Sequence, residues 1–145
     1  MRSMVCKGCE QIKNRGRIHL FQSYRDGWRD GEQERDFIYI KDALEMVLFI
    51  YRHPELTGIF NIGSGKARTW NDLADAIFDA LEAERQIVYV SMPPEIRDTY
   101  QYHTEAEMTK LRRAGYDRPV TPLEDAVRDY VAGYLVPGRY LAGTT

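Results

Sequence analysis

The sequence predicts an α/β protein whose strands belong to a parallel sheet. The stretches "FIYI" (37–40) and "IFNI" (59–62) are apolar on both faces, as in parallel strands that helices cover on each side. The helix between them is apolar nearly all round, which is typical of a buried helix. Strands and helices alternate along the rest of the chain. Two such strands cannot bury this helix and both sheet faces, so part of the sheet is expected to lie outside the chain.

The first half of the chain divides at glycines and prolines. The expected elements are a helix over about residues 3–14, a strand over 17–21, a Gly- and Asp-rich loop over 23–34, a strand over 36–40, a helix over 42–52 and a strand over 58–63. Asp42 is a suitable N-cap for the second helix. This helix should end by Arg52, because the residue before Pro54 is disfavoured in the α region.

The second half is expected to hold three helices and one strand. Thr69 and Asp72 have the spacing of a capping box, and Leu73, Ile77 and Leu81 follow at intervals of four on one face. A strand should follow over 86–90. The remaining helices are expected from Thr104 to Gly115 and from Thr121 onward, the latter with Pro122 at its first position.

Composition restricts the class of protein. The chain has 145 residues, 43% hydrophobic and 29% charged, as expected for one globular domain with a core. A net charge of −2 gives no general attraction to nucleic acid or to an acidic membrane. No apolar run approaches the roughly 20 residues of a membrane span, and no secretory signal precedes the first helix. Two closely spaced cysteines give no disulfide framework, so a cytoplasmic protein is expected.

Three short motifs suggest sites that we consider less probable than structural roles. "GSGK" (63–66) resembles a phosphate-binding loop but lacks its earlier glycine and its final hydroxyl residue, so we interpret it as a strand-to-helix turn. Cys6 and Cys9 have the spacing of a metal or redox pair, but no second pair accompanies them. Trp28 could stack on a nucleobase or could lie at an exposed loop tip.

Longer stretches resemble a known family. They are "RDFIYIKDA", "GIFNIGSGKARTWNDLADAI", "RDTYQYHTEAEMTKLRRAGYDRP" and "TPLEDAVRDYV". They resemble the C-terminal part of the extended short-chain dehydrogenase/reductases that act on nucleotide sugars, the NAD-dependent epimerase/dehydratase family. The resemblance runs from Met1 to about Leu135. "LFQSYRDGWRDGEQERDFIYIKDA" is similar to the family members that epimerise an ADP-heptose.

The resemblance implies a division of the intact enzyme into two parts. Residues 1–135 would form the substrate-binding region of a Rossmann-type enzyme, 36–62 would pack on the missing Rossmann domain, and 136–145 would be a tail. NADP would be bound by the missing N-terminal half. The intact enzyme would act on an ADP-sugar and form a homo-oligomer.

The resemblance also implies that the catalytic residues lie elsewhere. The sequence has no G-x-G-x-x-G or G-x-x-G-x-x-G turn for a dinucleotide and no Tyr-x-x-x-Lys pair. In the family that tyrosine exchanges protons. The chain alone is therefore expected to be inactive.

By the family pattern, this chain supplies residues that hold the substrate. They are Lys7, Phe21, Gln22, Ser23, Tyr24, Arg35 and Tyr100. Arg35 would bind the diphosphate, for which a planar guanidinium is well suited, and Tyr100 would lie at the substrate end. The roles of Lys7, Gln22 and Ser23 rest on the resemblance alone.

Each of these residues also has a structural interpretation. Arg35 could form a salt bridge with Glu32 or Glu34, which on a surface would contribute little. Tyr100 could be a core or interface tyrosine, and Lys7 could be solvated on a polar helix face.

Other functions stay open from the sequence. The chain could be part of another nucleotide-sugar epimerase or dehydratase, or a non-catalytic module that binds nucleotide sugars. A zinc or redox adapter built on the two cysteines is a third alternative.

Overall fold

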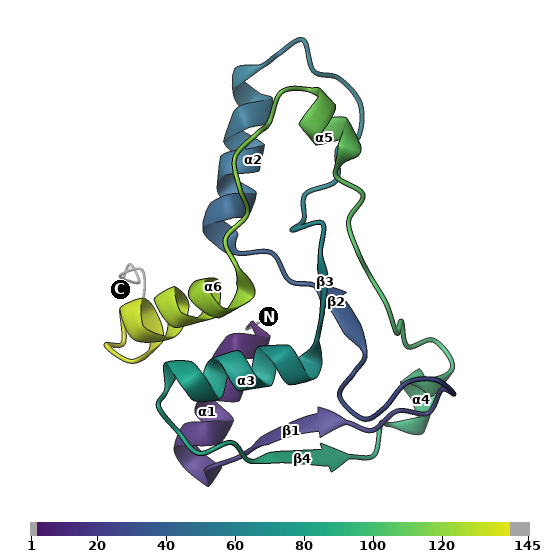
Figure 1. Cartoon of the computed structure of the whole chain (residues 1–145), viewed down its shortest axis with the longest axis vertical. Helices are drawn as coiled ribbons and strands as arrows, with labels where there is room; N and C mark the ends of the chain where they lie inside the picture. Colours follow the sequence, from purple (N-terminus) through teal and green to yellow (C-terminus); the bar gives the residue numbers. More distant parts are fainter. Residues whose placement is uncertain (1–2, 140–145) are drawn as a thin grey trace, which may run out of the picture.

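A computed structural model describes residues 3–139 of the chain. The elements are α1 (Met4–Arg15), β1 (Ile18–Phe21), β2 (Glu34–Asp36), α2 (Ile40–Arg52), β3 (Ala67–Thr69), α3 (Trp70–Ala80), β4 (Ile87–Val90), α4 (Pro94–Arg97), α5 (Thr109–Arg113), α6 (Leu123–Tyr130) and a π-helical turn, η1 (Val131–Leu135). Figure 1 shows α2 and α5 at one end of the molecule and α1, α3, β1 and β4 at the other, with β2 and β3 between them. Of the expected tail, residues 140–145 lie outside the described part.

The main core joins the two ends of the sequence. Helices α1 and α3 pack on β1, α6 packs on α3, and the turn η1 contacts both α1 and α3. Ile77, Phe78 and Val131 are almost fully buried at its centre. Burial of this apolar surface is the main force that holds these elements together.

Two small sheets make up the strand structure. Strand β1 pairs with β4 in parallel, from Ile18 opposite Ile87 to Phe21 opposite Val90. Strand β2 pairs antiparallel with β3, which the sequence did not predict. The parallel pair with its covering helices confirms the α/β class.

Helix α3 begins as predicted. Thr69 Oγ1 accepts the N–H of Asp72 (2.9 Å), and the Asp72 carboxylate accepts the N–H of Thr69 (3.0 Å). This capping box satisfies two N–H groups that a helix start leaves unpaired. Leu73 and Ile77 of the predicted face are buried.

A second core lies between α2 and α5. Met46, Leu111 and Tyr116 are buried there. Lys110 of α5 donates to the carbonyl oxygens of Thr57 (3.3 Å) and Ile59 (2.8 Å), so the segment after α2 is hydrogen-bonded to α5. This end of the molecule has its own small core.

The two predicted parallel strands are not strands in this structure. Strand β2 ends at Asp36, and residues 37–39 and 59–62 belong to no strand or helix. Their N–H groups make no hydrogen bond to any of residues 3–139. A strand needs a hydrogen-bonded neighbour, and the described residues offer none to these segments.

Helix α2 also differs from the prediction. It starts at Ile40 rather than after Asp42, and the Asp42 carboxylate instead accepts the N–H (2.8 Å) and hydroxyl (2.9 Å) of Thr121. Of its side chains only Met46 is buried. The sequence leads to the expectation that a part of the protein outside this chain covers the helix, and its burial there stays a prediction.

The exposed apolar residues of α2 form one face. They are Ile40, Leu44, Val47 and Tyr51, and Ile59 lies exposed in the segment that follows the helix. The intervals of four, three and four place the helical residues on one side. Tyr51 is 82% and Ile59 88% exposed. We call these five residues the α2 face.

Two later helices are shorter than predicted. Residues 104–108 precede α5 without being helical, and Glu107 accepts the N–H of Thr109 (2.7 Å) instead of capping a helix from Thr104. Helix α6 begins at Leu123, with Pro122 at the N-cap. Helix α4, which was not expected from the sequence, has Pro94 at its start.

Candidate functional site

Arg35 lies on aromatic rings. Its guanidinium carbon is 5.0 Å from the ring centroid of Tyr100 and 5.9 Å from that of Trp70. Its Nη1 donates to the carbonyl oxygen of Glu34 (2.6 Å). Strand β2 fixes its backbone opposite Arg68 of β3. The guanidinium is thus held by stacking and one hydrogen bond, which leaves N–H groups for an anion.

The alternative ion pairs of Arg35 are not formed. Glu32 pairs with Arg29 (2.6 Å), and Glu34 pairs with His103 (2.7 Å). Arg35 has no ion pair within residues 3–139. An arginine that lacks a carboxylate partner is well suited to bind an anionic ligand.

Tyr100 extends the cluster toward β1. Its hydroxyl accepts the indole N–H of Trp70 (3.1 Å). Its ring meets that of Phe21 edge-on, with centroids 6.3 Å apart, and that of Tyr102 with centroids 5.6 Å apart. Phe21, Arg35 and Tyr100, which the sequence predicted as substrate contacts, therefore lie together.

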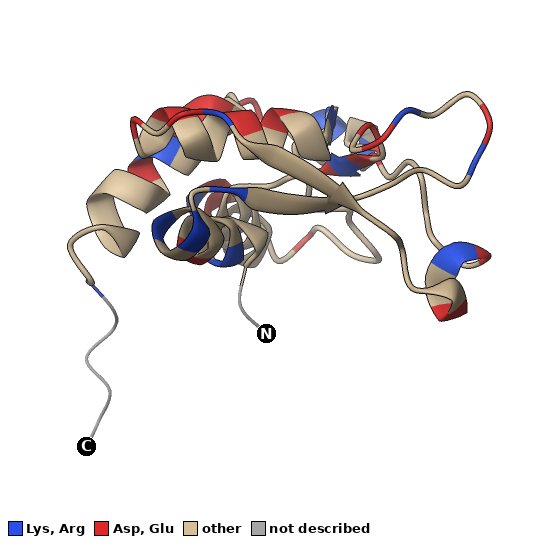
Figure 2. Cartoon of the chain, turned by 90° about the horizontal axis from the view of Figure 1, so that it is seen from below, with Lys and Arg blue, Asp and Glu red and all other residues tan. Residues whose placement is uncertain are grey.

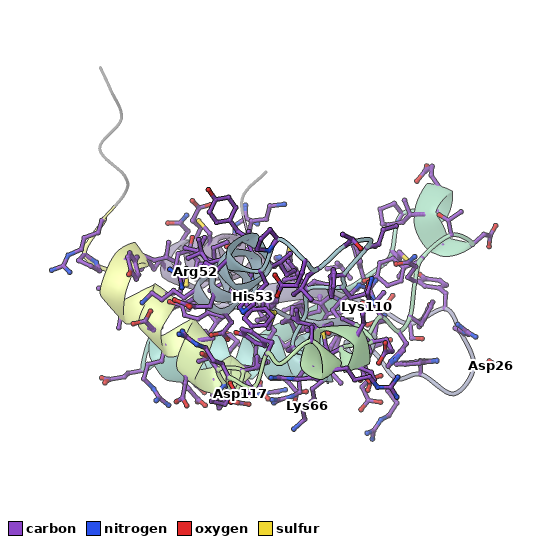
Figure 3. All side chains as sticks on the ribbon, turned by 90° about the horizontal axis from the view of Figure 1, so that it is seen from above. Asp26, Arg52, His53, Lys66, Lys110 and Asp117 are labelled. Atoms are coloured by element: carbon purple, nitrogen blue, oxygen red, sulfur yellow. The ribbon has the colours of Figure 1, made fainter. Side chains whose placement is uncertain are left out.

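The loop after β1 is fixed by its backbone. The N–H of Gln22 continues the β1–β4 pairing by donating to the last residue of β4 (2.9 Å). The N–H of Ser23 donates to Asp30 (2.7 Å), and that of Tyr24 donates to the hydroxyl of Tyr102 (2.8 Å). Beyond Tyr24 the loop projects from the molecule, with Asp26 at its outer end (Figure 3).

Gln33 closes the base of this loop. It is fully buried, and its amide nitrogen lies 3.3 Å from the carbonyl oxygen of Gln22 and 3.5 Å from that of Phe21. The backbone carbonyl oxygen of Gln33 accepts the N–H of Trp70 (3.2 Å). Gln33 thus ties the loop to the start of α3. One glutamine within a charged run gives no sequence signal for this role.

Asp36 is the main polar contact between distant segments. Its carboxylate accepts the N–H and hydroxyl of Ser64 (both 2.6 Å) and the N–H groups of Gly65 and Ala106 (both 2.9 Å). Burial alone would raise the pKa of Asp36, but these hydrogen bonds outweigh it and hold the pKa below its usual value.

The "GSGK" stretch therefore binds the Asp36 carboxylate. The amides of Ser64 and Gly65 are occupied by this carboxylate, which explains the likeness to a phosphate loop. Gly65 has a φ of +69°, and a Cβ at Gly63 would lie 2.7 Å from Asp36 Oδ2. Glycine is therefore required at Gly65 for its backbone conformation and at Gly63 for lack of space.

Lys7 is not brought to this cluster. It is exposed on α1, and no contact within the described residues joins it to Arg35 or Tyr100. Its predicted role is not supported by the geometry of this chain alone.

The other two sequence motifs have structural surroundings. Cys9 is buried in the main core, and burial raises the pKa of its thiol to about 11. Cys6 is half-buried beside it, and both are free thiols. Trp28 packs on Tyr102 with ring centroids 5.7 Å apart.

An apolar groove of about 620 Å³ borders the cluster. Its walls come from the start of α1, residues 35–40, the first turn of α3 and α6. Arg35 and Trp70 lie on its wall. A ligand bound to Arg35 would therefore lie next to the apolar surface of residues 37–39, which pair with no strand within residues 3–139.

The chain matches one family by its sequence. Residues 2–63 match the sequence model of the NAD dependent epimerase/dehydratase family. This region holds α1, β1, the loop, β2 and α2. Over these residues the chain is therefore similar to the NAD dependent epimerase/dehydratase family.

Individual relatives narrow the class further. The chain is 48% identical over 135 residues to the ADP-L-glycero-D-manno-heptose-6-epimerase of Nitratidesulfovibrio vulgaris (strain DP4), which covers 93% of this chain and 42% of the relative. It is 41% identical over 141 residues to the enzyme of the same name from Fusobacterium nucleatum, with the same two coverages. The chain is thus a homologue of ADP-heptose 6-epimerases and spans about two fifths of their length.

A solved structure shows the same fold. The ADP-L-glycero-D-manno-heptose-6-epimerase of Helicobacter pylori matches with a TM-score of 0.74 at 23% identity, covering 92% of this chain and 38% of that chain. The architecture is therefore that of part of a Rossmann-type enzyme. None of the helices among residues 3–139 is long and apolar enough to cross a membrane.

Proposed function

We propose that this chain is the substrate-binding C-terminal half of an NADP-dependent ADP-glycero-manno-heptose 6-epimerase. The observation that carries the proposal is the unpaired Arg35 on Tyr100 and Trp70, beside Phe21, in a chain 48% identical to such an enzyme. The intact enzyme would interconvert ADP-D-glycero- and ADP-L-glycero-D-manno-heptose for the core of lipopolysaccharide.

The residues of this chain would bind and orient the substrate. Arg35 would hold the diphosphate through its free N–H groups, and Tyr100 would contact the substrate beside it. Residues 21–24 would form the wall of the site. Lys7 would contribute to the site only in the intact enzyme. NADP would accept a hydride from C6 of the sugar and return it to the opposite face, which inverts that carbon. The groups that move protons would come from the N-terminal half.

The α2 face and the unpaired segments support the existence of that half. The N–H groups of residues 37–39 and 59–62 have no acceptor in the described part of the chain, and the α2 face is apolar and exposed. Both are properties of surfaces that another part of the protein covers. We propose that residues 36–62 pack on a Rossmann half. The free thiols fit a reducing compartment, so we assign the enzyme to the cytoplasm. We also propose that the intact enzyme forms a homo-oligomer.

A fusion protein tests the proposal. The N-terminal portion of the Nitratidesulfovibrio vulgaris relative is joined to this chain in place of its own matching region, and we call the product the completed protein. We expect it to epimerise ADP-D-glycero-D-manno-heptose with NADP, and the chain alone to be inactive.

Two outcomes would contradict the proposal. Preferred turnover of a UDP- or GDP-sugar by a folded completed protein would assign another epimerase or dehydratase. Binding of ADP-heptose by this chain without turnover in the completed protein would make it a non-catalytic module. Activity of the unmodified relative serves as the control.

A further inference from the structure

Tyr24 is half-exposed on a projecting loop, yet three contacts hold it in place. Its N–H donates to the hydroxyl of Tyr102 (2.8 Å) and its hydroxyl accepts an N–H of Arg97 (3.2 Å). Its ring lies 3.8 Å from the Arg97 guanidinium carbon. Its side chain remains 45% exposed. The contacts fix the orientation of a ring that still faces outward.

Arg97 is itself anchored. It is the last residue of α4, and its Nε donates to the carbonyl oxygen of Met92 (2.8 Å), which is fully buried. Its side chain forms no ion pair within residues 3–139. A planar guanidinium can stack on a ring and donate in its own plane, and lysine can do only part of this. Figure 2 shows α4 and the loop at the same end of the molecule.

Tyr102 joins Tyr24 to the Arg35 cluster. Tyr102 is only 4% exposed, and its ring contacts that of Tyr100 with centroids 5.6 Å apart. Tyr100 in turn lies under Arg35. Two substrate residues of the proposed function, Tyr24 and Tyr100, are therefore connected through one buried tyrosine that is not itself exposed to a ligand.

We propose that Arg97 and Tyr102 are positioning residues that set the orientation of Tyr24 toward the nucleotide sugar. This rests on the proposed function. Both act through Tyr24 rather than on the reacting atoms. Their loss lets the loop move, so the substrate binds less tightly while the chemical step is unchanged.

The test measures KM and kcat for ADP-heptose in the completed protein. We expect Arg97→Ala and Tyr102→Phe each to raise KM about tenfold, with kcat changing less than about twofold. Arg97→Lys should resemble Arg97→Ala, because a point charge cannot replace the stacked fork. Arg17→Ala, at an exposed arginine before β1, is the matched control and should leave KM unchanged.

A double-substitution cycle separates positioning from general stability. In a Tyr24→Ala background, Arg97→Ala should add no further increase in KM, because its effect passes through Tyr24. Additive effects of the two substitutions on KM would overturn the inference. An unchanged KM would also overturn it, either in Arg97→Lys or in both Arg97→Ala and Tyr102→Phe. Absence of turnover in the unsubstituted completed protein would instead contradict the proposed function.

Discussion

At the scale of the residue, two neighbours in β2 have different tasks. Arg35 has no carboxylate partner among residues 3–139 and lies on aromatic rings, whereas Asp36 accepts four hydrogen bonds from two distant segments. The first arrangement leaves donors free for a ligand. The second satisfies a partly buried charge and holds the segments around it together.

Arg35→Lys tests the ligand role. We expect kcat/KM of the completed protein for ADP-heptose to fall about tenfold to a hundredfold, because lysine keeps the charge but loses the fork and the stacking. Steady-state kinetics gives the value, and Arg113→Lys on α5 is the control. Equal kinetics in both variants would remove Arg35 from the site.

Asp36→Asn tests the structural role. We expect it to lower the free energy of unfolding by about 2 kcal/mol at neutral pH, because four donors lose a charged acceptor. Since the folded pKa of Asp36 is lowered, its stabilisation is present above the unfolded pKa of about 3.9 and is lost as pH falls through the folded pKa.

Thermal unfolding of the completed protein at neutral and acidic pH measures this effect. The gap between wild type and Asp36→Asn should close toward acidic pH. Asp26→Asn, at the outer end of the exposed loop (Figure 3), should match wild type throughout. A gap that is independent of pH would rule out the charge of Asp36 as the cause.

At the scale of the element, the sequence predicted what depends on local signals. The α3 capping box, helix α1 and the strands β1 and β4 follow from nearby residues and are present, whereas the pairing of β1 with β4 joins distant residues and was not predicted. The strands over 36–40 and 58–63 depend on a distant partner and are absent. Thr104 and Glu107 have capping-box spacing, but the segment is instead drawn to Asp36 through the N–H of Ala106.

The candidate site was predicted only in part, for a related reason. Family likeness identified Arg35, Tyr100 and the loop after β1, which the structure brings together. It did not identify Tyr102, Arg97 or Gln33, because their contacts reach back to the loop from 11 to 78 residues away. The pair of tyrosines two residues apart in "RDTYQYHT" was the one available signal for Tyr102.

The α2 face makes a prediction of its own. Val47→Glu should reduce association of the isolated chain, because it places a charge on an exposed apolar face. In the completed protein the same change should lower the free energy of unfolding by about 2 kcal/mol or more, because the face is then buried.

Sedimentation of the chain and thermal unfolding of the completed protein measure the two effects. Val136→Glu is the matched control, because Val136 is 56% exposed and lies at the end of η1 rather than on the α2 face. It should change neither property. If Val47→Glu behaved like Val136→Glu in the completed protein, the α2 face would not be covered there.

At the scale of the whole molecule, residues 3–139 leave an apolar helix face uncovered and leave backbone N–H groups of two segments without an acceptor. Residues 37–39 line the apolar groove, residues 59–62 include Ile59 of the α2 face, and the N–H groups of both segments have no acceptor among residues 3–139. A sheet that continues into an N-terminal half would satisfy all of them. The relatives, of which this chain covers 42%, have the length for such a half.

Amide hydrogen exchange of residues 37–39 and 59–62 tests this central claim most directly. In the chain alone these amides should exchange as fast as exposed loop amides, because nothing pairs with them. In the completed protein we expect slow exchange, like that of β1, because the segments become sheet strands. Fast exchange in an active completed protein would contradict the claim that they join the Rossmann sheet.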